Sequence, residues 1–442
     1  MIKSLQKCEY CYKEPIDKGI LCIDTDEEYK VFLDGLESYL DKQGLKNALL
    51  FTKDGIVTQN HVGVIKYKNF QLDILPKLLS KSENIKDNGQ YIVKNLIYMI
   101  SLTQKLDIKM TEHADINHCE NPFLEVLIRE YATSLFECLK RLTPRNYIRE
   151  EDNLNYLKGK LKFTENIRYN CANQAKFYCE YDEFSENNKL NQLFLFVAKC
   201  LFNISNSSEN RKILSFIMNY FCDLPLVRYD KYKADKIILT RNQQLFSHPF
   251  KIAKMFLENI SVDISKNSIE NITLLWDMNL LFEEFVYEII KRHVTGYTPY
   301  YQKNKKLLRN VDNLKEYGNT FVDVYLQKND NKDKIILDTK YKINSGGNSE
   351  FLNSDIYQVC TYCLLHNTNK AILFYPADLD FESNTNIKEK YFVVPKISGF
   401  ELNSDNSDIS VHRIMIQLHQ DLTKITEHIN EFTDILHNHV LN

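Results

Sequence analysis

Two short apolar segments of the sequence carry charged residues that could do chemistry together. Asp323 lies in the segment Phe321–Leu326, and Asp338 and Lys340 lie in the segment Lys334–Lys340. A polar turn separates the two segments, and this pattern predicts an antiparallel hairpin. Residue types and spacing therefore place two carboxylates and one ammonium group on neighbouring strands.

The hairpin has its midpoint between Asp330 and Asn331 in this interpretation, so Asp323 faces Asp338. Opposed residues in such a pair have Cβ atoms roughly 5 Å apart, where like charges destabilise the sheet. A divalent cation is the usual compensation. Lys340 lies two residues after Asp338 and therefore projects from the same face of the strand. The three groups could bind Mg²⁺, activate water and stabilise a phosphorane-like charge. The alternative is an exposed ion pair at a strand end.

The helix expected before the hairpin offers a third acid. By helical spacing Glu284 and Glu288 fall with Lys291 on the outward face. Glu283 falls at the margin of the apolar stripe. It is therefore either a rim residue or a third carboxylate directed at the site.

The helix expected after the hairpin contains Gln358 and Tyr362, which are four residues apart and share one face. An amide and a phenol there could orient a phosphate or the catalytic lysine. Taken alone, the spacing favours a half-buried core tyrosine.

A basic segment precedes the hairpin and interleaves aromatic residues with four cations, which are Lys303, Lys305, Lys306 and Arg309. Such a segment could neutralise DNA phosphates without reading sequence. The alternative is an ordinary solvated strand or turn.

The helices and strands expected around these residues predict an α/β fold class, with an α+β arrangement for the chain as a whole. We expect a β-rich N-terminal domain over 1–90, a mostly helical middle region over 91–263 and a C-terminal domain with a mixed sheet flanked by helices over 264–442. Expected strands are Asn47–Thr52, His61–Tyr67, Phe70–Leu75, Lys370–Tyr375 and Tyr391–Val394. Expected helices are Asn121–Leu142, Lys189–Ser205, Thr273–Arg292, Asp355–His366 and Ile409–Leu436.

Composition excludes several function classes. The 442 residues carry a net charge of −3, so there is no global basic signature for nucleic acid. The 12 glycines form no phosphate loop, and the 11 histidines form no His-Glu-x-x-His motif. No signal peptide or membrane span is recognisable, which predicts a cytoplasmic protein. The pairs Cys8/Cys11 and Cys360/Cys363 could bind zinc or iron–sulfur, but the second pair lies in a helical pattern and is typical of core residues.

In this order Glu283, Asp323, Asp338-Thr-Lys340 and Gln358-x3-Tyr362 resemble the core of the PD-(D/E)xK nucleases. More narrowly, the chain resembles the McrC family, the nuclease subunits of McrBC-type modification-dependent restriction systems. Further similar segments are Val62–Val64, Leu72–Lys77, Tyr156–Leu161, Tyr181–Glu186, Leu274–Glu283, Ile336–Lys342 and Asp355–Gln358. Val322 stands where the family often has proline, and because the aspartate supplies the ligand this departure should be tolerated.

The resemblance implies a Mg²⁺-dependent DNA endonuclease of a phage-defence restriction system, in which Mn²⁺ could replace Mg²⁺. Asp323, Asp338 and the Thr339 carbonyl would hold the metal, and Lys340 would polarise water or stabilise charge. Glu283 would join the ligands or orient the water, and Gln358 and Tyr362 would position the lysine or a phosphate.

The resemblance also implies two partners: double-stranded DNA, and an McrB-like AAA+ GTPase ring that binds GTP and carries the reader of modified or specific DNA. The N-terminal and middle regions would dock into that ring and stimulate GTP hydrolysis. Two alternatives stay open, a non-catalytic activator of the ring and a stand-alone nuclease of the same fold.

Overall fold

The computed structural model describes residues 3–9, 15–21, 23, 25–68, 70–77, 95–103, 122–173, 175–263, 268–309, 311, 314–330, 333–342, 349–376, 391–393 and 409–416. The chain divides into two compact units. Unit 1 combines Met1–Ile65, Asn69–Ile108 and Leu274–Asn442, and unit 2 combines Lys66–Lys68 and Lys109–Thr273. All the candidate site residues therefore belong to unit 1.

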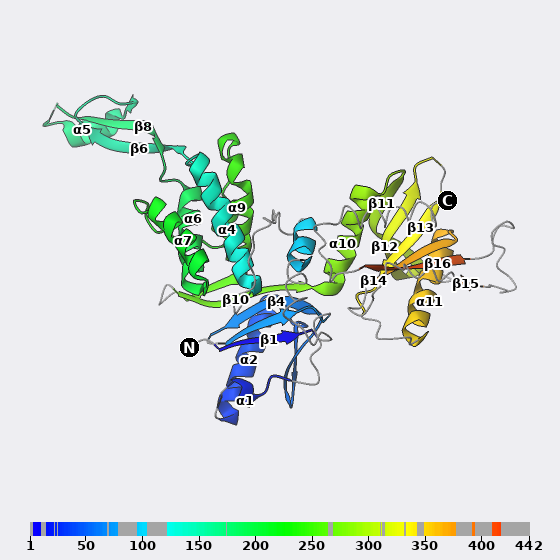
Figure 1. Ribbon diagram of the computed structural model, residues 1–442. Coiled ribbons are helices and arrows are strands. Elements are labelled where there is room, and N and C mark those ends of the chain that lie inside the picture. The colour runs from blue at the N-terminus through cyan, green and yellow to red at the C-terminus, as the bar shows by residue number, and fades with distance from the viewer. Residues whose placement is uncertain are drawn as a thin grey trace. The chain divides into compact units, whose positions relative to one another are not determined.

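The N-terminal part of unit 1 contains a sheet and one long helix. The sheet places neighbouring strands in the order β1 (Lys3–Cys8), β5 (Phe70–Leu75), β4 (His61–Tyr67) and β10 (Ser268–Asp277), and β1 runs parallel to β5. Strands β2 (Leu49–Thr52) and β3 (Gly55–Thr58) form a separate hairpin, and α1 (Lys18–Leu21) precedes the long helix α2 (Asp26–Lys42). Figure 1 draws β1, β4 and the helix α2 in blue and β10 in green. The strands expected from the sequence in this region are confirmed.

Helix α2 was not expected in a β-rich segment, yet its start is well specified. The Thr25 side chain accepts a hydrogen bond from the backbone N–H of Glu28 at 3.2 Å, which is an N-cap. Three acidic residues in the first turn complement the helix dipole. Leu36 and Leu40 are fully buried on one face, so the helix packs as an amphipathic element.

Unit 2 is built on helices around an aromatic core. They are α4 (Pro122–Arg141), α6 (Lys189–Ile204), α7 (Ser208–Tyr220), α8 (Lys231–Asp235), the 3-10 helix η2 (Arg241–Phe246) and α9 (Ser247–Asn259). The Tyr131 ring meets Phe256 edge-on at 6.4 Å, and its hydroxyl donates to the Phe194 carbonyl at 2.9 Å. Strand β9 (Ile260–Asp263) pairs antiparallel with the start of β10. The helices expected at 121–142 and 189–205 are confirmed.

Unit 2 also contains a small three-stranded sheet, called here the β6–β8 module. Strands β6 (Asn146–Leu154), β8 (Phe177–Ser185) and β7 (Lys160–Leu161) are antiparallel in that order, and α5 (Phe163–Asn170) packs on β8. Figure 1 shows this module projecting from the helices of unit 2. The sequence did not predict this sheet, because its charged strands lack an apolar alternation.

The C-terminal part of unit 1 is a mixed six-stranded sheet. The order is β11 (Tyr297–Arg309), β12 (Glu316–Lys328), β13 (Lys334–Thr339), β14 (Lys370–Pro376), β16 (Ile409–Ile416) and β15 (Tyr391–Val393). The first three strands are antiparallel, β13, β14 and β16 are parallel, and β15 is antiparallel to β16. Helix α10 (Met278–His293) packs on β11–β13, and α11 (Ser349–His366) packs on β13, β14 and β16. The expected mixed sheet with flanking helices is therefore present.

The helix expected over Thr273–Arg292 is wrong in its first turn, because β10 extends to Asp277. The Asp277 side chain accepts hydrogen bonds from the backbone N–H groups of Asn279 at 2.8 Å and Leu280 at 3.3 Å. This N-cap fixes the start of α10 at Met278.

The helix expected over Ile409–Leu436 is wrong where the structure describes it. Residues 409–416 form strand β16, which lies parallel to β14 and buries Ile409, Val411 and Ile414. Residues 417–436 lie outside the described residues. A short apolar run cannot be assigned to helix or strand from periodicity alone, and here the exposed edge of β14 decides the outcome.

Candidate functional site

The two aspartates predicted to face each other lie on adjacent strands at one end of their pairing. Strands β12 and β13 pair from Gln327–Lys334 to Val324–Leu337. One further step in this register brings Asp323 opposite Asp338, which is the arrangement that the hairpin predicts. The strand pairing ends there, so the carboxylates lie where the sheet opens.

Asp323 connects the ends of the two strands through its side chain. Its Oδ2 atom accepts one hydrogen bond from the Thr339 backbone N–H at 2.7 Å and another from the Thr339 hydroxyl at 2.8 Å. Burial raises the pKa of Asp323, while the Thr339 donors and Lys340 lower it. The carboxylate is thus held in one orientation by two donors.

Asp338 is the most deeply buried acid of the site, with 1% of its surface exposed. Its Oδ2 atom forms an ion pair with the Lys340 ammonium at 2.5 Å. The pKa of Asp338 is raised to about 7, mainly by burial and then by the Asp323 carboxylate, against the opposing effect of Lys340. Burial lowers the pKa of Lys340, but Asp338 outweighs it and the net shift is upward, so the lysine is a cation.

Glu283 lies on α10, and the charge of the Asp323 carboxylate acts on its side chain. Its pKa is raised to about 7, mainly by burial and then by Asp323. Its Oε1 atom accepts a hydrogen bond from Gln302 Nε2 at 3.0 Å. Burial raises the pKa of Tyr301, and the neighbouring Glu283 raises it further. Of the two interpretations of Glu283, its proximity to Asp323 favours an acid directed toward the site.

Gln302 is a site residue that the sequence analysis missed. It lies on β11 between the pairs Tyr301–Val324 and Lys303–Val322, so its register position is opposite Asp323. Its φ of +46° is in the left-handed region, which a non-glycine residue rarely adopts. Strained backbone of this kind clusters at functional sites. No pattern in the sequence signals it, because glutamine is unremarkable inside a strand.

The predicted pair on α11 is joined in the structure. Gln358 Nε2 donates to the Tyr362 hydroxyl at 2.7 Å. Burial raises the pKa of Tyr362, and the charges of Asp338 and Lys340 also act on it. The phenol therefore lies near the catalytic candidates, although its ring, 7% exposed, also belongs to the core between α11 and the sheet.

A second buried carboxylate, that of Asp355, acts on Asp338 through its charge. Asp355, 3% exposed, contacts Lys342 Nζ at 2.8 Å and accepts a hydrogen bond from the Tyr375 hydroxyl at 2.9 Å. Its charge raises the pKa of both Asp338 and Lys340. Asp355 lies in a segment that resembles the family, but its role could not be predicted from the sequence because its partners come from two other segments.

Two of the four basic candidates contact the protein itself. Lys303 lies over the rings of Tyr300 and Tyr325, at 4.7 and 4.0 Å, and Lys305 donates to the Leu365 carbonyl at the end of α11. Lys306 and Arg309 are exposed. DNA contact by this segment stays a prediction.

The acids of the site fit a divalent cation. The Asp323 charge raises the pKa of both Glu283 and Asp338, so the three carboxylates lie close enough together to interact. In the described part of the chain no group of three or more His, Cys, Asp or Glu side chains is placed so that it could hold a metal ion. Mg²⁺ commonly takes one or two carboxylates and completes its shell with water. Asp323 and Asp338, with the Thr339 carbonyl, are the residues that could hold it.

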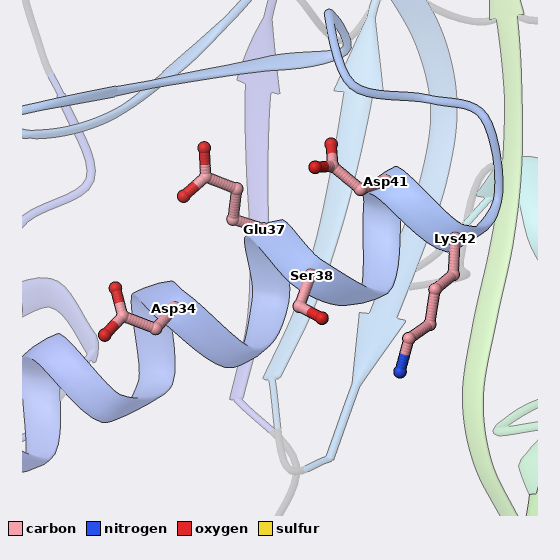
Figure 2. Close-up of a pocket in the computed structure, with 5 residues that line it drawn as sticks. All are labelled: Asp34, Glu37, Ser38, Asp41 and Lys42. Atoms are coloured by element: carbon pink, nitrogen blue, oxygen red, sulfur yellow. The ribbon is translucent and has the colours of Figure 1, made fainter.

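Other candidate sites offer less chemistry. Figure 2 shows an open depression on α2, lined by Asp34, Glu37, Ser38, Asp41 and Lys42, which includes none of the residues above. Cys363 is buried and Cys360 is half-buried, both as free thiols, in the helix expected for them, and Cys11 lies outside the described residues. No helix in the described ranges is long and apolar enough to cross a bilayer.

A family model and two solved structures that are similar to this chain all concern McrBC systems. The sequence model described as "McrBC 5-methylcytosine restriction system component" matches residues 56–376, which include all six catalytic candidates. A chain from the "Refined half-complex from tetradecameric assembly of Thermococcus gammatolerans McrB AAA+ hexamers with bound McrC" is 19% identical with a TM-score of 0.70, and the match covers 97% of this chain and 98% of that chain. A chain from the "Cryo-EM structure of the Thermococcus gammatolerans McrBC complex" is 22% identical with a TM-score of 0.50, covering 67% and 89%. With identities this low, the two structural matches show a shared fold alone. None of the curated proteins matches the chain.

Proposed function

This chain belongs to the family of McrBC 5-methylcytosine restriction system components, and on that premise we propose that it is the DNA endonuclease subunit of such a system. The single observation that carries the proposal is the buried Asp338 carboxylate, which is ion-paired with Lys340 and lies opposite Asp323 one register step beyond the last strand pair. Two acids and a lysine at the open end of a mixed sheet are the core of the PD-(D/E)xK arrangement.

The proposed reaction is hydrolysis of a DNA phosphodiester, in which water attacks phosphorus and the bond to the leaving oxygen breaks. When bound, Mg²⁺ would act as a Lewis acid on the phosphate. Asp323 and Asp338 hold the negative charge that attracts the cation. Lys340, kept protonated by Asp338, stabilises the charge that develops on the phosphoryl oxygens.

The remaining candidates hold the reactants in place. Glu283, with a pKa of about 7, is suited to orient the attacking water or to take its proton near neutral pH. Gln358 fixes the Tyr362 hydroxyl, which lies near the Lys340 charge and limits where the ammonium group can move.

We propose that the partner is an AAA+ GTPase ring similar to McrB. The support is the fold shared with a chain of a structure that contains McrB AAA+ hexamers with bound McrC. The sequence has no phosphate loop of its own, so GTP would be bound by the ring. A restriction enzyme divided in this way cleaves only when both chains are present.

The β6–β8 module supplies a surface suited to that docking. Seven large apolar residues on it are 51–74% exposed, and they are Tyr147, Tyr156, Leu157, Phe163, Ile167, Tyr169 and Phe184. The rings of Tyr147 and Phe184 lie 5.0 Å apart on adjacent strands. An apolar set of this density on a projecting sheet is typical of a protein interaction site.

The function is tested by cleavage of methylated and unmethylated DNA by the chain with its cognate AAA+ partner, GTP and Mg²⁺. We expect cleavage by the wild type and loss of at least about 1,000-fold in Asp338→Ala and Lys340→Ala, because each removes a main electrostatic group. Stimulation of GTP hydrolysis should persist in both variants. Cleavage at the wild-type rate in either would reject the assigned roles, and absence of cleavage by the wild type would leave only an activator of the ring.

The docking surface is tested separately by Phe184→Ser and Tyr147→Ser. We expect each to weaken partner binding by roughly 10-fold or more, because buried aromatic residues dominate interface energy. Tyr232→Ser is a matched control, since Tyr232 is 70% exposed on α8 of the same unit. Equal binding by all three variants would show that the module does not dock.

A further inference from the structure

Three side chains connect the N-terminal sheet of unit 1 to the strand that carries Lys340. Glu9 follows β1, Lys77 follows β5, and Tyr341 follows Lys340. Glu9 Oε2 accepts hydrogen bonds from the Lys77 backbone N–H at 3.0 Å and from the Tyr341 hydroxyl at 3.3 Å. Lys77 Nζ donates to the Tyr341 carbonyl at 2.5 Å and lies 4.1 Å from the centre of its ring. These three residues are called the Tyr341 clamp.

The clamp holds both the backbone and the side chain of Tyr341. Glu9 is 3% exposed and Tyr341 is 4% exposed, so the contacts are shielded from water. In such surroundings a cation and a carboxylate interact more strongly than at a surface. The Tyr341 ring also lies 5.8 Å from the ring of Phe282, the residue that precedes Glu283 on α10.

The position of the clamp along the chain connects it to the chemistry. Lys340, Tyr341 and Lys342 are consecutive, and each is tied to a different buried carboxylate, Asp338, Glu9 and Asp355 respectively. The Lys340 backbone N–H donates to the Phe374 carbonyl at 2.8 Å, and β13 ends at the residue before it. Beyond that bond, the Lys342 backbone N–H donates to the Lys340 carbonyl at 2.8 Å, and the side chains of Tyr341 and Lys342 make the buried contacts described above.

We propose that Lys77 is a positioning residue for the nuclease reaction. Together with Glu9 it fixes Tyr341, and through Tyr341 it fixes the place of the Lys340 ammonium group beside Asp338. The proposal deepens the proposed function and rests on it. It also gives a role to Leu72–Lys77, a segment that the sequence singled out and that the catalytic site does not contain.

The test compares Lys77→Met, Lys77→Arg and the wild type in the complete complex with the AAA+ partner, GTP and Mg²⁺. We expect Lys77→Met to lower kcat for DNA cleavage by roughly 10- to 100-fold, because a small misplacement of a catalytic group costs that much. KM and stimulation of GTP hydrolysis should not change. Lys77→Arg should restore most of kcat, since arginine can also donate to the Tyr341 carbonyl and lie over its ring. Lys53→Met, on an exposed turn of the same region, is the matched control and should behave as the wild type.

If the wild type cleaves and Lys77→Met cleaves equally well, the positioning role is overturned while the nuclease function stands. A parallel loss of GTPase stimulation in Lys77→Met would show a docking or folding defect and would also overturn it. A wild type without nuclease activity would remove the function and this inference together. If Lys77→Met does not fold, Lys77→Gln decides, because its shorter neutral amide cannot replace the ammonium group at the Tyr341 carbonyl and ring; a lower kcat supports the proposal and an unchanged kcat overturns it.

Discussion

The Asp323 Oδ2 atom accepts two hydrogen bonds from Thr339, from its backbone N–H at 2.7 Å and from its hydroxyl at 2.8 Å, where the backbone pairing of β12 and β13 has ended. The strands stop pairing at Val324–Leu337, and the carboxylate takes the backbone donor that the ladder leaves unused. This arrangement holds Asp323 toward Asp338 despite their like charges.

Replacing Thr339 tests how much this orientation contributes. Thr339→Val removes the hydroxyl donor and keeps the backbone donor. We expect cleavage to fall by roughly 10- to 100-fold, because a hydrogen bond to a charged group contributes about 1.5–3 kcal/mol. Thr339→Ser keeps the hydroxyl and should cleave within a few-fold of the wild type. Equal rates for the valine and serine variants in a DNA cleavage assay would show that the hydroxyl is dispensable.

Two substitutions of Gln302 test separately the strain of its backbone and the function of its side chain. Its left-handed φ of +46° favours glycine, so Gln302→Gly should be about 1 kcal/mol more stable than Gln302→Ala. Both variants lose the amide that donates to Glu283, so both should cleave more slowly than the wild type, and by similar factors. Urea unfolding and a cleavage assay measure the two effects. An alanine variant as stable as the glycine variant would contradict the strain.

Asp73 makes the stability of unit 1 depend on pH. Burial raises its pKa from 3.8 to about 7, so the folded state favours the protonated acid. The stabilising contribution of Asp73 is complete below pH 3.8 and is lost as the pH rises through about 7. Asp73→Asn mimics the protonated form. It should match the wild type near pH 4 and exceed it at pH 8 by up to about 4 kcal/mol in the free energy of unfolding. Equal urea midpoints at pH 8 would contradict this.

The exposed cations of β11 test the DNA contact. Lys306→Gln and Arg309→Gln should each weaken DNA binding to a similar degree for all sequences. Each should also reduce the slope of log affinity against log salt by about 1, because one phosphate contact is lost. A filter-binding titration at several salt concentrations gives both quantities. Unchanged slopes would show that these side chains do not contact phosphates.

The sequence predicted the part of the site that local patterning controls. The hairpin register follows from two apolar runs around a polar turn, and it places Asp323 and Asp338 correctly relative to each other. Gln358 and Tyr362 meet because helical spacing brings residues four apart onto one face.

The remainder depends on contacts between distant segments, which local patterns do not encode. Gln302 reaches Glu283 only because β11 crosses α10, and Lys77 reaches Tyr341 across 264 positions of the chain. The same limit explains β16, whose apolar run became a strand because β14 offered an edge to pair with. The β6–β8 module was missed for a related reason, since its strands face solvent and carry charge.

We predict that Asp323 and Asp338 share one divalent cation. A crystal of the chain soaked in Mn²⁺, measured at the manganese absorption edge, tests it most directly. We predict one anomalous peak within about 2.5 Å of a carboxylate oxygen of each aspartate, and its loss in Asp338→Ala. A map with no peak between the two side chains, or with a peak that persists in that variant, would contradict the claim.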